Sequence, residues 1–173
     1  AYRADATEEG PDDGSRHAVE RDRAMADNVL WVLQREGPSG RIVLWAHNAH
    51  IQKVRQWGER ARLGLFLDSM LGHDYVSIGF TFYRGVQSSR WEEPYRAPIV
   101  EPSKRGSLDG ELAQIGLPMF ILDLRTAPKA GPVYEWLNQV REMRWQREYL
   151  PLNPIQAWDA IFYIHSISPA QEK

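Results

Sequence analysis

The sequence contains no cysteine, which excludes disulfide bonds and thiolate sites. It also has no apolar run near the ~18 to 20 residues that a membrane-spanning helix needs, so we expect no membrane partner. The formal net charge of -2 gives no reason to expect nucleic acid as a partner. The chain starts at Ala1 without an initiator methionine or an apolar signal segment. We interpret this start as a truncation and expect a cytoplasmic protein.

Several familiar catalytic motifs are missing as well. The sequence has no G-x-S-x-G nucleophile elbow, no phosphate-binding P-loop and no G-x-G-x-x-G dinucleotide fingerprint. If the chain hydrolyses a substrate, the nucleophile is therefore water, activated by a general base or by a metal ion.

What is present is the composition of an ordinary globular domain, with 173 residues of which 43% are hydrophobic and 25% are charged. Residues 1–15 are acidic and glycine-containing, and we expect them to be disordered or a loop. Helical and strand patterns alternate over residues 16–173, which predicts one α/β domain with a largely parallel sheet. The predicted helices are 16–34, 62–71, 107–113 and 132–140, and the predicted strands are 41–46, 75–82, 118–124 and 158–164. Segment 141–154 has no clear pattern. Segment 84–103 is expected to be irregular, with Trp91 and Tyr95 packing on the core or lining a pocket.

Polar side chains follow directly after the apolar run of residues 41–46. His47, Asn48 and His50 come where the predicted buried strand ends, and ligands of open α/β sheets bind at the carboxyl ends of parallel strands. Two imidazoles suit proton transfer and oxyanion stabilisation at neutral pH. Their H-x-x-H spacing also allows a metal site, although the sequence offers no third ligand in a fitting context. A third interpretation is a pair of ordinary surface histidines.

Two neighbouring segments carry further candidate binding residues. In the helix predicted over 16–34, Asp22 falls on the apolar side and Arg21 at its margin. This pair either supports a site from a partly buried position or belongs to an acidic first turn that meets the helix dipole. Residues 52–62 are basic, and Arg55 in this segment either holds a substrate anion or belongs to a solvated face.

Several segments resemble one known family. The sequence Trp45-Ala46-His47-Asn48-Ala49-His50 resembles the W-A-H-N-x-H signature of the erythromycin esterase family, which includes succinoglycan-biosynthesis-like proteins. Residues 21–28 resemble the R-D-x-x-M-A-x-N helix of this family, and residues 64–82 resemble its G-x-x-L-x-x-x-L-G and Y-x-x-x-G-F segment. Residues 158–164 resemble its terminal F-D-A strand. The likeness extends in the right order over most of residues 16–170.

The resemblance implies an α/β/α fold with helices on both faces of the sheet. It also implies hydrolysis of a macrolide lactone or another small-molecule ester by water, without an acyl-enzyme, a required metal or a cofactor. His47 would face the reacting centre, His50 would be its neighbour in the same pocket, and Asn48 would fix the loop.

The resemblance also implies that the general base is a histidine in an N-terminal G-E-x-x-H-G-type motif, which this sequence lacks. We therefore expect the chain to be the C-terminal half of a longer hydrolase, inactive without its N-terminal half. The alternatives are a metal-binding domain that uses His47 and His50, or a non-catalytic biosynthetic accessory domain.

Overall fold

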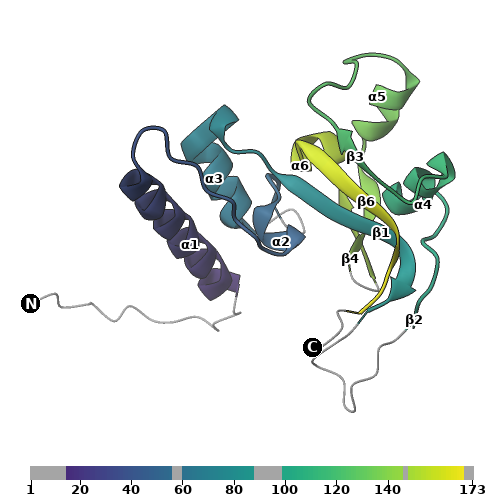
Figure 1. The fold of residues 1–173 in the computed structure, drawn as a ribbon, viewed down its shortest axis with the longest axis horizontal. Helices are drawn as coiled ribbons and strands as arrows, with labels where there is room; N and C mark the ends of the chain where they lie inside the picture. The colour runs from purple at the N-terminus through teal and green to yellow at the C-terminus, as the bar shows by residue number, and fades with distance from the viewer. Residues whose placement is uncertain (1–14, 56–59, 88–98, 146–147, 170–173) are drawn as a thin grey trace, which may run out of the picture.

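A computed structural model describes residues 15–55, 60–87, 99–145 and 148–169 (Figure 1). Most of the expected N-terminal loop 1–15 lies outside these residues, as do residues 56–59 of the basic segment and both Trp91 and Tyr95.

Two helices form a small layer at one end of the structure. Helix α1 (Ser15–Glu36) packs against α3 (Leu63–Leu71), as the apolar periodicity of both segments predicts (Figure 1). Ala26, Leu63 and Leu67 are buried between them. The short helix α2 (Asn48–Ile51) contacts α3 on one side and the sheet on the other, and η1 (Gly72–Asp74) follows α3. None of the described helices combines the length and the apolar character needed to cross a membrane.

The sheet has four strands in the order β2-β1-β6-β3, and it is mixed. Strand β1 (Ile78–Val86) pairs in parallel with β6 (Ala160–Ile167), whereas β2 (Ile99–Val100) and β3 (Met119–Asp123) are antiparallel to their neighbours. The prediction of a largely parallel sheet is therefore wrong. A parallel neighbour needs a crossover connection, usually a helix. Between β3 and β6, segment 141–154, for which the sequence predicted no element, contains a hairpin of β4 (Arg141–Trp145) and β5 (Glu148–Leu152). The chain then enters β6 antiparallel to β3.

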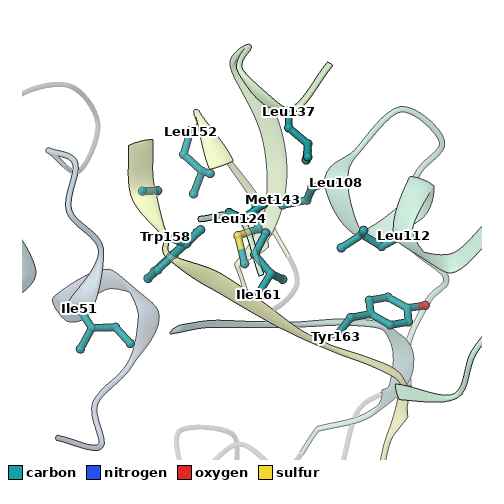
Figure 2. Close-up of a cluster of buried hydrophobic side chains, with 11 residues drawn as sticks. Ile51, Leu108, Leu112, Leu124, Leu137, Met143, Leu152, Trp158, Ile161 and Tyr163 are labelled. Carbon is teal, nitrogen blue, oxygen red and sulfur yellow. The ribbon is translucent and has the colours of Figure 1, made fainter. Parts of the chain in front are cut away.

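One face of the sheet carries the main hydrophobic core. Helix α4 (Leu108–Leu112) and the β4–β5 hairpin contribute buried side chains that pack with Trp158, Ile161 and Tyr163 (Figure 2). A Cβ atom on Gly79 of β1 would lie 2.7 Å from the Trp158 ring, so the glycine lets the indole lie directly on the strand. The remaining short elements around this core are η2 (Ala113–Ile115), α5 (Pro132–Leu137) and α6 (Pro154–Ala157).

The opposite face of the sheet is apolar and open. Thr81 of β1 and Ser77, which directly precedes this strand, are only 3% and 1% exposed, whereas Phe80 on the other face of β1 is 37% exposed. Across the sheet, Met119 and Ile121 of β3 are 59% and 60% exposed. The predicted helices on both faces are therefore not found within the described ranges, where packed elements bury one face only.

The strand predicted over residues 41–46 is not formed. In the described part of the chain this segment pairs with no strand, although its burial alternates as in extended backbone. Ile42, Leu44 and Ala46 are half-buried, whereas Val43 and Trp45 are 93% and 82% exposed. An apolar run forms a buried strand only where neighbouring strands and helices cover both of its sides. In the described structure the side that bears Val43 and Trp45 is exposed.

Candidate active site at a histidine turn

His47 lies at the start of α2 and caps this helix. Its Nδ1 accepts a hydrogen bond from the backbone N–H of Ala49 at 3.2 Å. In the neutral ring the proton is therefore on Nε2, which becomes a hydrogen-bond donor. The ring packs edge-on against Trp145 of β4, with 4.5 Å between the ring centroids. The cap and the indole together hold the imidazole in one orientation.

The carboxamide of Asn48 fastens this turn to the edge of β1. Its Nδ2 donates to the carbonyl oxygen of Phe80 at 2.6 Å, and its Oδ1 accepts from the N–H of Phe80 at 3.0 Å. The side chain thus bonds both backbone groups of one strand residue, as a neighbouring strand would. Through these two hydrogen bonds Asn48 would fix the loop, the role expected for it.

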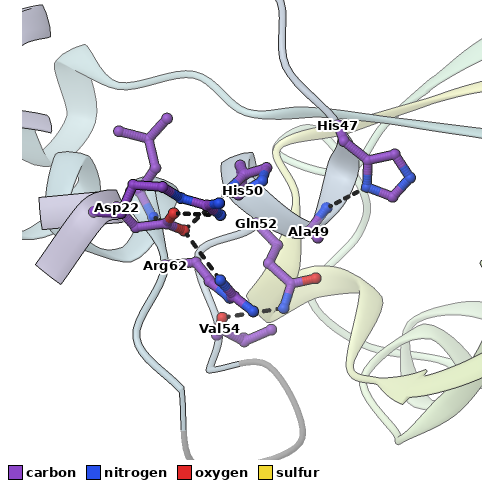
Figure 3. Close-up of polar contacts among 9 residues, drawn as sticks. Asp22, His47, Ala49, His50, Gln52, Val54 and Arg62 are labelled. Atoms are coloured by element: carbon purple, nitrogen blue, oxygen red, sulfur yellow. Dashed lines mark hydrogen bonds and ion pairs between the residues drawn. The ribbon is translucent and has the colours of Figure 1, made fainter. Parts of the chain in front are cut away.

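His50 lies one turn further and is bound by a carboxylate. Its Nδ1 is 2.9 Å from Oδ2 of Asp22 on α1, a residue that is fully buried (Figure 3). The same carboxylate accepts the N–H of Leu63 at 3.3 Å and lies 3.7 Å from Arg62 and 3.4 Å from Arg21. A carboxylate has no hydrogen to donate, so His50 donates from Nδ1, and Nε2 is the unprotonated nitrogen of its neutral ring. The two histidines are thereby held in opposite tautomers.

Asp22 is on the second turn of α1, because the helix begins at Ser15. This position supports the interpretation of a buried pair with Arg21 over that of an acidic first turn.

The two imidazoles lie on different sides of α2. Figure 3 shows the His47 ring on the far side of this helix from the Asp22–His50 pair. His47 and Asn48 line a cavity of about 1880 Å³ together with Trp45, Phe80 and Trp145, and the described lining does not include His50 or Asp22. Arg55 is exposed.

Sequence reasoning did not single out the residues that support these side chains. The Arg62 side chain is almost fully buried beside Asp22. Arg144, next to Trp145, donates from its guanidinium to Ser103 Oγ at 2.9 Å and from its backbone N–H to Asp109 at 2.9 Å. Burial raises the pKa of the Asp109 carboxyl above its ordinary value. No local spacing marks these residues, because the partners named in this paragraph are 35 or more positions away in the sequence.

In the described ranges no three histidine, aspartate or glutamate side chains are grouped so that they could hold a metal ion.

The sequence profile of the erythromycin esterase family matches residues 1–167. The chain belongs to the erythromycin esterase family.

Relatives of this erythromycin esterase family chain are more than twice as long as the segment they share with it. The chain is 28% identical over 164 residues to erythromycin esterase type II of Escherichia coli, a match that spans 87% of this chain and 38% of that enzyme. A protein of Bacillus cereus of known structure is 25% identical, with a TM-score of 0.76 over 94% of this chain and 42% of its own. A succinoglycan biosynthesis protein is 26% identical, with a TM-score of 0.76 over 90% and 40% of the two chains.

The position of His47 in this family chain makes folding stability depend on pH. Burial, and secondly the charge of His50, lower the pKa of His47 below the ordinary value of 6.5. The unfolded chain then binds more protons than the folded chain at acidic pH, so the free energy of unfolding falls as pH drops below about 6.5.

We expect His47→Gln to reduce this decrease, as measured by urea unfolding at pH 7.5 and pH 5. His73→Gln is the control, because the His73 side chain is 96% exposed. Equal pH dependence in both variants would contradict the lowered pKa of His47.

Proposed function

We propose that this chain supplies the histidine part of a hydrolase active site that cleaves carboxylic esters with water, with a macrolide lactone as the candidate substrate. Membership of the erythromycin esterase family supports the hydrolytic reaction. The observation that carries the proposal is the pair of fixed imidazoles, with His50 bound to the buried Asp22 and His47 at the wall of the large cavity.

In this proposal His47 stabilises the charge that develops on the ester. Its Nε2–H donates to the carbonyl oxygen as water adds to the carbonyl carbon and negative charge builds up on that oxygen. The lowered pKa of His47 suits this role, because a neutral imidazole keeps the donor proton in place near neutral pH. Trp145 and the Ala49 N–H keep the ring from rotating away.

His50 is the proton-transfer imidazole. Its free Nε2 accepts a proton while Asp22 stabilises the imidazolium that results, as a buried carboxylate does in other hydrolases. The proton that His50 accepts is the one that the general base removes from the attacking water. His50 gives this proton to the alcohol oxygen as the bond between the carbonyl carbon and that oxygen breaks, so the alcohol leaves neutral and the ring returns to its starting state. His50 lies across α2 from the cavity. The proton therefore moves between His50 and the reacting groups in the cavity through bound water or through a group from the rest of the family domain.

The binding roles fall to three further residues. Asn48 holds the turn, while Arg21, which is 61% exposed beside Asp22, and the exposed Arg55 offer cationic groups to the substrate.

The chain spans about two fifths of the length of its relatives. We expect the general base that activates water to come from the part of the family domain that lies outside this chain.

The test compares the isolated 173-residue chain with the complete gene product that contains it. Each is incubated with erythromycin, and ring opening is followed by mass spectrometry as the gain of one water. We expect turnover by the complete product and none above the buffer rate by the isolated chain, because a general base contributes about 100- to 10,000-fold. A panel of simpler lactones and esters follows if erythromycin is not turned over. Turnover by the isolated chain would refute the assignment of the base to the missing part.

A further inference from the structure

Asp109 is a buried carboxylate that joins three elements of the fold. It is on α4 and is 0% exposed. Its Oδ1 accepts the hydroxyl of Thr81 on β1, and its Oδ2 accepts the backbone N–H of Arg144 on β4 at 2.9 Å. Burying a carboxylate is costly unless its oxygens are hydrogen-bonded. Here each oxygen has a partner, one on each of the two strands.

The two strands that Asp109 joins belong to different sheets. Strand β1 is in the four-stranded sheet and β4 is in the two-stranded hairpin, and among the described strands no backbone ladder connects the two sheets. Their relative position therefore depends on the side chains between them. The Asp109 carboxylate is one such link. The Arg144 guanidinium adds another, because it donates to the carbonyl oxygen of Tyr83 on β1 at 3.3 Å.

The residues next to the two anchored positions hold the histidine turn. Phe80, which directly precedes Thr81 on β1, binds the Asn48 carboxamide with both of its backbone groups. Trp145 directly follows the anchored residue of β4, and its ring packs on the imidazole of His47 at 4.5 Å between centroids. The turn is thus held from β1 at one residue and from β4 at the residue before it. A shift of one strand against the other would break one of these two contacts.

We propose that Asp109 is a positioning residue for the proposed hydrolysis: by fixing β1 against β4, it keeps Trp145 in contact with His47 while Asn48 stays bound to Phe80. The inference rests on the oxyanion-stabilising role proposed for His47. Asp109 is not part of the described cavity lining, so it acts through the turn and not on the substrate. A displacement of about 1 Å in a group that contacts the reacting atoms can cost about 100-fold in rate.

Three variants of the complete gene product test this proposal. Asp109→Leu keeps a similar volume and removes both hydrogen bonds. Thr81→Val is nearly isosteric and removes only the bond to β1. Asp109→Asn is the conservative replacement, because its amide can accept from the Arg144 N–H and donate to the Thr81 oxygen.

Ser107→Ala is the matched control at the start of the same helix. Ser107 is also 0% exposed, and its hydroxyl accepts the N–H of Gly110 at 3.1 Å and donates to the carbonyl oxygen of Lys104 at 2.8 Å. Loss of this N-cap should destabilise the fold without releasing β1 from β4. The control therefore separates a loss of stability from a loss of position.

The variants are compared by the ¹⁵N shifts of labelled histidine at a temperature at which circular dichroism shows them to be folded. His47→Gln assigns the signals of His47. We expect Asp109→Leu and Thr81→Val to move these shifts from those of a ring protonated on Nε2 towards the average of the two tautomers. Asp109→Asn and Ser107→Ala should leave them in place.

Turnover of an ester substrate gives the second measurement. We expect Asp109→Leu to lower kcat about 10- to 100-fold while KM changes less than about twofold, because the cavity that binds the substrate keeps its lining. Asp109→Asn should recover most of this loss. The nitrogen shifts do not depend on turnover, so their result is separate from that of the ring-opening assay.

Unchanged His47 shifts in a folded Asp109→Leu variant would overturn the proposal. An equal change of these shifts in Ser107→Ala would also overturn it, because any loss of stability would then loosen the ring. If Asp109→Leu does not fold, Thr81→Val decides. Displaced shifts with an unchanged kcat would overturn Asp109 as a positioning residue for hydrolysis and, with it, the role proposed for His47.

Discussion

Replacing Asp22 with asparagine is expected to lower kcat/KM for ester hydrolysis by the complete gene product about 100- to 10,000-fold. The carboxylate is 2.9 Å from His50 Nδ1 and fixes the proton on that nitrogen. An asparagine amide can donate to Nδ1 instead, which moves the ring proton to Nε2 and removes the free acceptor. The loss should fall mainly on kcat, because the cavity wall around His47 is unchanged.

Asp27→Asn is the matched control for this variant. Asp27 is on the same helix, carries the same charge and is 58% exposed, so its replacement should change kcat/KM less than twofold. Both variants are assayed at a temperature at which circular dichroism shows them to be folded. Full activity of a folded Asp22→Asn enzyme would remove His50 from the proposed proton transfer.

Replacing Gly64 with alanine is expected to lower the free energy of unfolding by about 3 kcal/mol. A Cβ atom at this position would lie 2.2 Å from the carbonyl oxygen of Ile51 and 2.5 Å from that of Gln52. These are backbone atoms at the end of α2, so the clash separates α3 from the helix that carries His50. Because α3 packs on α1, this separation also moves Asp22 of α1 away from His50 of α2. The same variant should therefore also reduce hydrolysis.

Ser69→Ala serves as the comparison for Gly64→Ala, because Ser69 is exposed on the same helix. Its free energy of unfolding, measured by urea titration, should stay within about 0.5 kcal/mol of the original value. An equally small effect of Gly64→Ala would mean that α2 and α3 are less closely packed than the structure indicates.

The local parts of the fold could be predicted from sequence because they depend on neighbouring residues. The apolar periodicity of α1 and α3 predicted both helices, and it correctly placed Asp22 on the packed side of α1. His47, Asn48 and His50 were predicted to share one pocket at the end of an apolar run. His47 and Asn48 line the described cavity, whereas His50 is not part of its lining. Their catalytic and binding roles stay predictions until activity is measured.

The errors concern features that depend on distant partners. Residues 41–46 have the composition of a buried strand, yet pairing needs a neighbour that the described chain does not supply. Residues 75–82 were correctly predicted to include a strand, β1, but composition could not show that the face of this strand bearing Phe80 would be the open one. The β4–β5 hairpin was missed because Arg144 is a charged residue in a buried position, and several of the groups that bind it, such as the Asp109 carboxylate and the Glu101 carbonyl oxygen, come from other parts of the sequence.

The most direct test of the account is the protonation state of the two ring systems. In the complete gene product at pH 9, labelled with ¹⁵N at histidine, the nitrogen shifts should show His47 protonated on Nε2 and His50 protonated on Nδ1. His47→Gln and His50→Gln variants assign the two signals. The same tautomer for both rings, or rings that average between tautomers, would contradict the claim that this turn holds a donor and an acceptor imidazole in fixed positions.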